Sequence, residues 1–310
     1  MTSASQDWEK WDDAPLYELF NYLKRELDTT NTEAQTFLNS VCKGKPNGSN
    51  KVTVTLKKKD LIPFYKMRQI PFELGGILDI SEEGLLRSGI VGGSKKTVHS
   101  SQLPDYAVHF HTHPSFPAVP DNIGIFEYTI ERYKKKPSKF PIDVMFQSVS
   151  NSDISTFSAI VLQNRSQAML IFTPEGVYVL TPDLAKLRNL QPEQRDIEAL
   201  QKEGKDILKK RNEIITDDIK KMKAYLLNAL GPKSKPRPAS QVDEQEIISF
   251  LQKTQKNLAR KIVEMINQDH SILRVRYYIW TTDKIDIEIY CSRVLADASS
   301  FLGLSPHQDY

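Results

Sequence analysis

The stretch Val108-His109-Phe110-His111-Thr112-His113-Pro114 carries three of the six histidines of the chain at alternate positions. Residues 106–113 are typical of a short strand, in which alternate side chains point to the same face of a sheet. Two neutral imidazoles held side by side in this way can bind one zinc ion, with Zn–N bonds of about 2.0–2.1 Å. The stretch therefore predicts a rigid metal-binding strand, whose chemistry depends on what else reaches the metal.

Length and composition indicate a globular protein. With 310 residues, the chain can form one large domain or two ordinary ones, each with a sizeable core. The net charge of +3 is a small surplus, and the lysine-rich stretches at 57–59, 134–136 and 209–211 are more typical of solvated surfaces than of phosphate-binding patches. The composition therefore argues against nucleic acid as a partner.

Cysteine usage and hydropathy indicate an intracellular protein. Cys42 and Cys291 are far apart and form no Cys-x-x-Cys pair, which argues against a disulfide scaffold and a cysteine-rich zinc module. The polar N-terminus lacks the apolar core of a signal peptide. No apolar run approaches the ~20 residues of a membrane helix. We expect a cytoplasmic or nuclear protein without membrane association.

Changes in pattern divide the chain into three expected regions. Residues 1–60 form an N-terminal extension, with helices over 14–27 and 32–42 and a strand over 52–56. Residues 61–182 are rich in short β-like segments, expected at 72–80, at 85–91 paired with 96–99, and at 168–173 paired with 176–181. Between these segments, residues 115–139 have few regular apolar anchors and are expected to form a long excursion. Residues 183–310 form a helical arm and a C-terminal region.

The third region combines long helices with two strands. Apolar residues at helical spacing over 193–230 and 244–267, joined by the breaker-rich segment 231–238, predict an antiparallel helical hairpin. Such a hairpin commonly packs against its own domain, and the alternative is an arm that binds a protein partner or dimerises. Residues 274–280 and 284–290 predict a terminal β-hairpin.

Two acidic residues are candidates to complete a metal site. A catalytic zinc site usually has three protein ligands and an open position for water. Asp153, in Ser150-Asn151-Ser152-Asp153, is a candidate third ligand, although such a residue is more often a helix cap or turn residue. Glu73 lies among apolar residues and glycines, where an acid invites a functional interpretation, although a lone acid is more often an exposed strand residue.

Taken in order, these elements resemble the JAMM motif of MPN-type metalloproteases, a family that includes zinc-dependent deubiquitinating isopeptidases. The motif has the form Glu-x-x-Gly-x-Leu, His-x-His-Pro and Ser-x-x-Asp. The matching residues are Glu73, Gly76 and Leu78, then His111, His113 and Pro114, then Ser150 and Asp153. The resemblance covers roughly residues 64–182. The element His-x-His-Pro alone is weakly specific, whereas all three in order with matching flanks are fairly specific.

The resemblance implies a fold, a cofactor and a reaction. The fold is α+β, an MPN-like mixed sheet with flanking helices, followed here by the long helical hairpin and the terminal β-hairpin. Zn²⁺ would be held by His111, His113 and Asp153. Glu73 would take a proton from water and pass it to the leaving amine, and Ser150 would donate a hydrogen bond to the oxyanion. The expected substrate is an amide or isopeptide bond, such as one that joins ubiquitin or a ubiquitin-like protein to lysine.

The other histidines have simpler expected roles. His109 shares the strand face with the ligand pair, and a polar role beside the site or at the surface is expected rather than coordination. His99, His270 and His307 have no companions in the sequence and are expected to be ordinary residues.

The spacing of the third motif element departs from the family. Ser-x-x-Asp usually follows His-Pro after a short gap, whereas here residues 115–149 intervene. Either these residues are an insertion or the site is degenerate, with Asp121 as the reserve third ligand. The helix and strand pair expected after Asp153 favour an insertion. It would lie beside the metal, as a lid or substrate-selecting loop.

Three functions remain open at the level of the sequence. The first is a zinc-dependent peptidase or isopeptidase, which the presence of Glu73, His111 and His113 favours. The second is a non-catalytic MPN-like scaffold that assembles a protein complex through its helical arm, which the displaced Ser-x-x-Asp favours. The third is a structural or accidental metal site in an unrelated α+β protein.

Overall fold

The computed structural model describes thirteen stretches of the chain. These are residues 51–67, 70, 73–81, 84–92, 107–113, 123, 125–135, 148–162, 166–189, 197–231, 237–238, 241–270 and 272–290. The helices expected at 14–27 and 32–42, the strand expected at 96–99, and Asp121 lie outside them.

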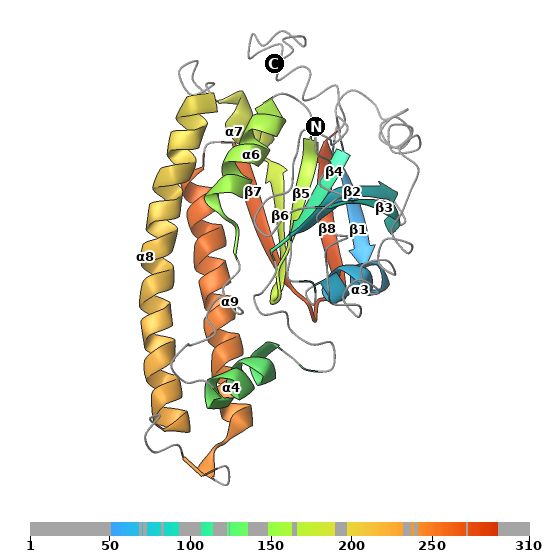
Figure 1. The fold of residues 1–310 in the computed structure, drawn as a ribbon. Coiled ribbons are helices and arrows are strands. Elements are labelled where there is room, and N and C mark those ends of the chain that lie inside the picture. The colour runs from blue at the N-terminus through green and yellow to red at the C-terminus, as the bar shows by residue number, and fades with distance from the viewer. Residues whose placement is uncertain are drawn as a thin grey trace.

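A six-stranded mixed sheet forms the centre of the molecule (Figure 1). Its strand order is β3 (Gly84–Gly92), β2 (Leu74–Ser81), β4 (Ala107–Thr112), β5 (Ser166–Phe172), β6 (Gly176–Pro182) and β7 (Leu273–Ile279). Strands β4 and β5 are parallel, and the other neighbours are antiparallel. Between β4 and β5 the chain forms the helices α4 (Ile125–Lys135) and α6 (Asn151–Leu162). The fold is therefore α+β with a mixed sheet and flanking helices, as expected.

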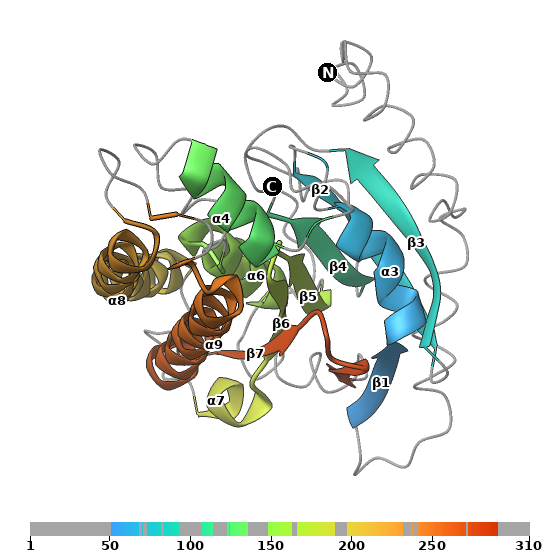
Figure 2. The same ribbon diagram turned by 90° about the horizontal axis from the view of Figure 1, so that it is seen from below.

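Alternate residues of the sheet strands contribute to two separate cores. On one face, Phe110, Leu170 and Val179 pack with α3 (Lys58–Met67) and a two-stranded ribbon of β1 (Lys51–Lys57) and β8 (Lys284–Tyr290). On the other face, Met169, Ile171, Tyr178 and Leu180 pack under α6, α8 (Ile197–Leu230) and α9 (Glu244–Asp269). Figure 2 shows α8 and α9 on one side of the sheet, and α3 and β1 on the other. His111 pairs with Ile171 in the β4–β5 register and thus belongs to the face under the helices.

The long helical hairpin is confirmed. The helices α8 and α9 run antiparallel along one face of the sheet and pack against their own sheet through the second core (Figure 1). Gly231 ends α8 in a left-handed conformation with φ 81°, which glycine adopts without steric cost. None of the helices that the structure describes is long and apolar enough to cross a membrane. A role of the hairpin as a partner-binding arm stays a prediction.

Part of the excursion expected over 115–139 is a helix, which corrects that expectation. In α4, Ile125 and Ile130 are buried, and Ile130 packs into a third core with Met222, Leu226 and Leu251 near one end of the helical hairpin (Figure 1). Helical spacing brings these few apolar residues to one face of α4. A helix of this length is marginally stable in isolation, and packing against α8 and α9 stabilises it. Lys134 of α4 also forms an ion pair with Glu244 at the start of α9.

The last two strands are present, but they do not form the expected terminal β-hairpin. Strand β7 pairs with β6 in the large sheet, whereas β8 pairs with β1 in the ribbon. An alternating pattern fixes which residues share a face, but it does not specify the partner strand. A short helix, α7 (Leu184–Arg188), follows β6. The division of the chain at residues 60 and 182 stays a prediction, and these strand pairs join elements from either side of it.

Candidate metal centre

Pairing between β2 and β4 brings Glu73 to the histidines. In the antiparallel register, Gly75 lies opposite His111, and continuing by two residues places Glu73 opposite His113. The backbone N–H of Leu74 donates to Thr112 Oγ1 at 2.8 Å and ties this end of β2 to β4. Because Gly75 has no side chain, the His111 imidazole has room on that face of the sheet. Glu73 is therefore held beside the imidazoles by the backbone of the sheet.

The start of α6 fixes the third candidate ligand by a reciprocal pair of hydrogen bonds. The backbone N–H of Ser150 donates to Asp153 Oδ2 at 2.6 Å, and the backbone N–H of Asp153 donates to Ser150 Oγ at 3.2 Å. This arrangement is a capping box in which Asp153, the third residue of the helix, takes the place of the usual glutamate. The cap residue is Ser150, and Asp153 is in the first turn of the helix, where a negative charge is favoured. Capping therefore positions the Asp153 carboxylate instead of competing with ligation.

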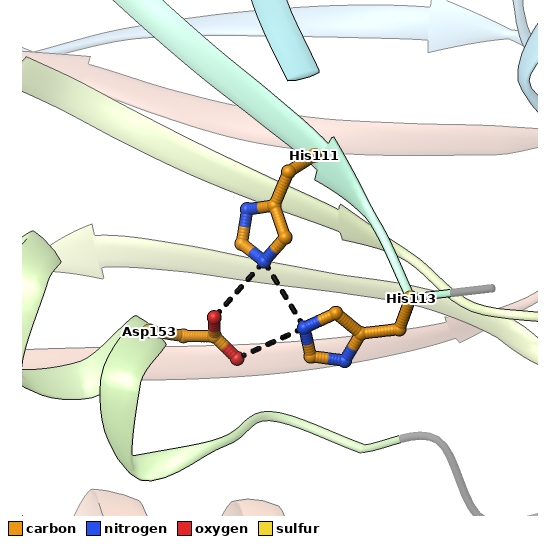
Figure 3. Close-up of side chains that lie close together, drawn as sticks. All are labelled: His111, His113 and Asp153. Carbon is orange, nitrogen blue, oxygen red and sulfur yellow. Dashed lines mark hydrogen bonds and ion pairs between the residues drawn. The ribbon is translucent and has the colours of Figure 1, made fainter. Parts of the chain in front are cut away.

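The three candidate ligands converge, as Figure 3 shows. His111 Nε2 lies 3.0 Å from Asp153 Oδ1, and His113 Nε2 lies 3.3 Å from Asp153 Oδ2. The two Nε2 atoms are 3.1 Å apart. Within the part of the chain that the structure describes, His111, His113 and Asp153 are the group of side chains arranged to hold a metal ion. Asp153 thus lies beside the histidines, as the interpretation of 115–149 as an insertion requires.

A backbone carbonyl orients the ring of His113. His113 Nδ1 lies 3.1 Å from the carbonyl oxygen of Ser148, and a carbonyl can only accept, so Nδ1 carries the proton of this hydrogen bond. The nitrogen that faces Asp153 and His111 is then Nε2, which can offer its lone pair to a metal. Both His113 and Ser148 are buried, which protects this hydrogen bond from competition with water.

Burial and the charges within the site shift the pKa values of Asp153, His113 and Glu73. Burial raises the pKa of Asp153, but the neighbouring His113 and His111 imidazoles outweigh it and hold this pKa well below its ordinary value. Burial lowers the pKa of His113, and the Asp153 carboxylate outweighs it, so that the net shift is upward. The pKa of Glu73 is raised by burial, against the opposing effect of His113 and His111. Asp153 is therefore a stable anion, whereas Glu73 holds a proton more readily than an ordinary glutamate.

The remaining histidines divide into two sets. His109 is buried on the same face of β4, as its position in the strand predicts, but it is not part of the converging group. His270 is buried at the end of α9, where Nδ1 accepts from the backbone N–H groups of Ile272 and Leu273. His99 and His307 lie outside the described residues.

Two residues near the site were not expected from the sequence. Ser148 orients His113 through its backbone carbonyl, a group that every residue possesses and that gives no sequence signal. Arg211 of α8 donates from Nε to Ser148 Oγ at 2.8 Å. Its sequence surroundings, Lys209-Lys210-Arg211, have the appearance of a solvated helix face. The available signal was the position of Ser148, two residues before the motif serine.

No known family model, curated protein or solved structure matches this chain. A function is therefore proposed from the residues of the site and their geometry.

Proposed function

We propose that the chain is a zinc-dependent hydrolase with an MPN-like fold, which cleaves isopeptide or peptide bonds at a JAMM-type site. The observation that carries this proposal is the convergence of His111, His113 and Asp153 beside Glu73, across the long segment that separates the motif elements. The substrate class, amide bonds that join ubiquitin or a ubiquitin-like protein to lysine, follows from the resemblance of the motif.

The donor set fits zinc. Two imidazole nitrogens and one carboxylate oxygen are ligands that zinc prefers, and three protein ligands are typical of catalytic sites. Bonds of about 2.0–2.1 Å at tetrahedral angles separate ligand atoms by about 3.3 Å. The two histidine Nε2 atoms, 3.1 Å apart, are close to this separation, and His111 Nε2 and His113 Nε2 lie 3.0 and 3.3 Å from different oxygens of Asp153. When bound, zinc supplies Lewis acidity that polarises a carbonyl group and lowers the pKa of water from ~15.7 toward ~7.

Glu73 is suited to move the proton. Its carboxyl group is half-buried, and burial raises its pKa toward the range in which a carboxylate exchanges protons efficiently. In the proposed reaction, Glu73 accepts a proton from the attacking water and delivers it to the leaving amine nitrogen. The oxygen of water joins the carbonyl carbon, the C–N bond breaks, and the products are a carboxylic acid and an amine, which ionise to a carboxylate and an ammonium group. No further reactant is needed.

Ser150 is suited to stabilise the negative charge that develops on the carbonyl oxygen. Its Oγ accepts from the backbone N–H of Asp153, which uses a lone pair and leaves the O–H bond able to donate. The same contact fixes the serine relative to the Asp153 carboxylate. Donors preorganised in this way typically contribute 10²–10³ in rate, or about 3–4 kcal/mol.

The non-catalytic scaffold is the alternative. Its main support is the displacement of Ser-x-x-Asp by residues 115–149, and this support is weakened because Ser150 and Asp153 adjoin the histidines. A scaffold also has no need of a carboxyl group with a raised pKa next to three metal-ligand side chains.

Cleavage of linked ubiquitin chains tests the proposal. We expect the zinc-loaded wild type to release ubiquitin, and the Glu73→Gln variant to be slower by about 10²–10⁴, because the amide keeps the shape but cannot accept the proton. Zinc affinity should stay close to that of the wild type. Glu264→Gln, at an exposed position of α9, is the matched control and should retain full activity.

Two results would count against this proposal in different ways. Full activity of Glu73→Gln would show that Glu73 is not the base. A wild type that binds one zinc ion but cleaves neither ubiquitin chains nor ubiquitin-conjugated lysine peptides would favour the scaffold.

A further inference from the structure

We propose that Arg211, on the long helix α8, is a positioning residue for the metal centre, which acts through Ser148 on the ring of His113. This inference rests on the proposed zinc site and extends it to the helical arm, because it assigns to α8 a part in holding a ligand. Arg211 and Ser148 are 63 residues apart in sequence.

Ser148 links the arginine to the ligand by two different groups. Its hydroxyl oxygen accepts from Arg211 Nε at 2.8 Å, and its carbonyl oxygen accepts from His113 Nδ1 at 3.1 Å. Ser148 is 4% exposed, and its contact with His113 is buried, whereas its contact with Arg211 is partly buried. A hydrogen bond to the second ring nitrogen fixes both the tautomer and the rotation of a ligating histidine. Arg211 thus restrains the residue that restrains His113.

The segment that Arg211 holds serves both sides of the site. Residues 148–150 form the return of the chain from the insertion into α6. The first residue of this segment contacts His113, and the last, Ser150, forms the capping box with Asp153. Fixing Ser148 against α8 therefore restrains two of the three candidate ligands at once. The hydrogen bond from Arg211 to the Ser148 hydroxyl is a side-chain contact between α8 and this segment.

The surroundings of Arg211 indicate that its inward position is specific. Its neighbours Lys209 and Lys210 are exposed, whereas Arg211 is half-buried and turned toward the sheet. Burying a guanidinium group is costly unless charge and hydrogen bonds compensate it. Burial lowers the Arg211 pKa, and Tyr178, Asp153 and Glu175 oppose this shift. Ser148, Tyr178 and Glu175 line one small cavity beneath the two long helices. Asp153 is the anion that compensates the guanidinium charge, because burial raises the pKa values of Tyr178 and Glu175 well above their ordinary values.

Metal affinity measures this role without reference to catalysis. We would determine the dissociation constant for Zn²⁺ by competition with a chromophoric chelator, and record the visible absorption of bound Co²⁺. The variants are Arg211→Ala, Ser148→Ala, which removes the hydroxyl but keeps the carbonyl, and the double variant. Arg260→Ala is the control, because Arg260 is an exposed arginine on α9 that pairs with Glu264. Thermal unfolding of each metal-free variant checks that it folds.

We expect Arg211→Ala and Ser148→Ala each to bind Zn²⁺ about 10-fold more weakly, at the lower end of the loss of about 10–100-fold that follows removal of a direct partner of a metal ligand, because the Ser148 carbonyl stays in place but is held less firmly. The Co²⁺ absorption should change with them. If Arg211 acts through the Ser148 hydroxyl, the double variant should be no weaker than Arg211→Ala alone. Arg260→Ala should match the wild type.

Other outcomes separate this inference from the zinc site itself. Wild-type affinity in both single variants, with affinity lost in Asp153→Asn, would overturn the role of Arg211 and leave the zinc site intact. Additive losses in the double variant would overturn the path through Ser148. A wild type that binds no Zn²⁺ would overturn both the site and its positioning residue.

Discussion

At the scale of single residues, Asp153 combines two roles that are alternatives when its sequence is considered alone, a role in capping a helix and a role as a metal ligand. One carboxylate oxygen, Oδ2, accepts from the backbone N–H of Ser150, and the other, Oδ1, faces His111. The capping bond selects one rotamer before any metal binds, so less side-chain entropy is lost on ligation. The low pKa of this carboxyl group, which the two imidazoles maintain, keeps it ionised. A helix cap is thus a way to preorganise a ligand.

His270 is a buried histidine outside the candidate metal site, and its role is in stability. Its Nδ1 accepts backbone N–H groups, so the neutral ring fits the site, and burial with nearby Lys186 lowers its pKa to about 3. In the unfolded chain this pKa is near 6.5. The unfolded state therefore binds more protons between these values, and stability from this group is complete above pH 6.5 and lost as pH falls toward 3.

The predicted consequence is a pH-dependent difference between the wild type and His270→Gln. The variant should be less stable at pH 7, and its deficit should shrink by about 1.4 kcal/mol per pH unit between pH 6 and 5. Urea denaturation of both proteins at several pH values measures this. A deficit that stays constant over this range would show that His270 is not held neutral by the fold.

At the scale of elements, an ion pair with a buried carboxylate joins the two long helices. Asp218 of α8 is 6% exposed and accepts from Lys261 Nζ of α9 at 2.8 and 3.1 Å. Its neighbour Asp217 is exposed and pairs with Lys221 of its own helix. A buried carboxylate bonded across an interface is worth more than an exposed pair within a helix, because solvent screens it less.

We predict that Asp218→Ala lowers the free energy of unfolding by about 1–3 kcal/mol, the range for hydrogen bonds to charged groups. Asp217→Ala, the adjacent control, should change it much less, because Asp217 is exposed and solvent screens its pair with Lys221. Chemical denaturation of both variants and of Lys261→Ala tests this. Equal effects of Asp217→Ala and Asp218→Ala would mean that the pair between helices contributes nothing particular.

Periodicity predicted the elements that have strong patterns. Strand β4 was predicted from its alternation, β5 and β6 from short apolar runs that flank a turn, and helices α8 and α9 from helical spacing. Strands β7 and β8 were predicted as strands but assigned to each other, since their patterns do not distinguish the edge of the large sheet from β1. Helix α4 was missed because few apolar residues mark it and its stability comes from Ile130 docking against the hairpin.

The residues of the candidate site likewise divide into those that the sequence predicted and those that it did not. Glu73, His111, His113 and Asp153 were selected by a motif, and the structure brings them together. Ser148 and Arg211 were not selected, because one acts through its backbone and the other lies in a charged helix whose facing residue is known only from the fold. Motifs specify the side chains that do chemistry more readily than those that hold them.

At the scale of the whole molecule, the candidate site lies where the layers meet. The two histidines come from β4 and the residue that follows it, Asp153 comes from α6, and Arg211 reaches the site's border from α8. The opposite face of the sheet is covered by α3 and by the ribbon that joins β1 to β8 (Figure 2). The long segment between the motif elements is anchored by α4 near an end of the helical hairpin. The proposed chemistry would therefore depend on the packing of distant elements as well as on the motif.

The most direct test of the central claim is an anomalous difference map. Crystals grown with zinc would be measured on both sides of the zinc absorption edge. We predict one peak per chain, within about 2.0–2.2 Å of His111 Nε2, His113 Nε2 and one Asp153 oxygen. A map with no peak among these three atoms, or with its zinc peak at other residues, would contradict the account.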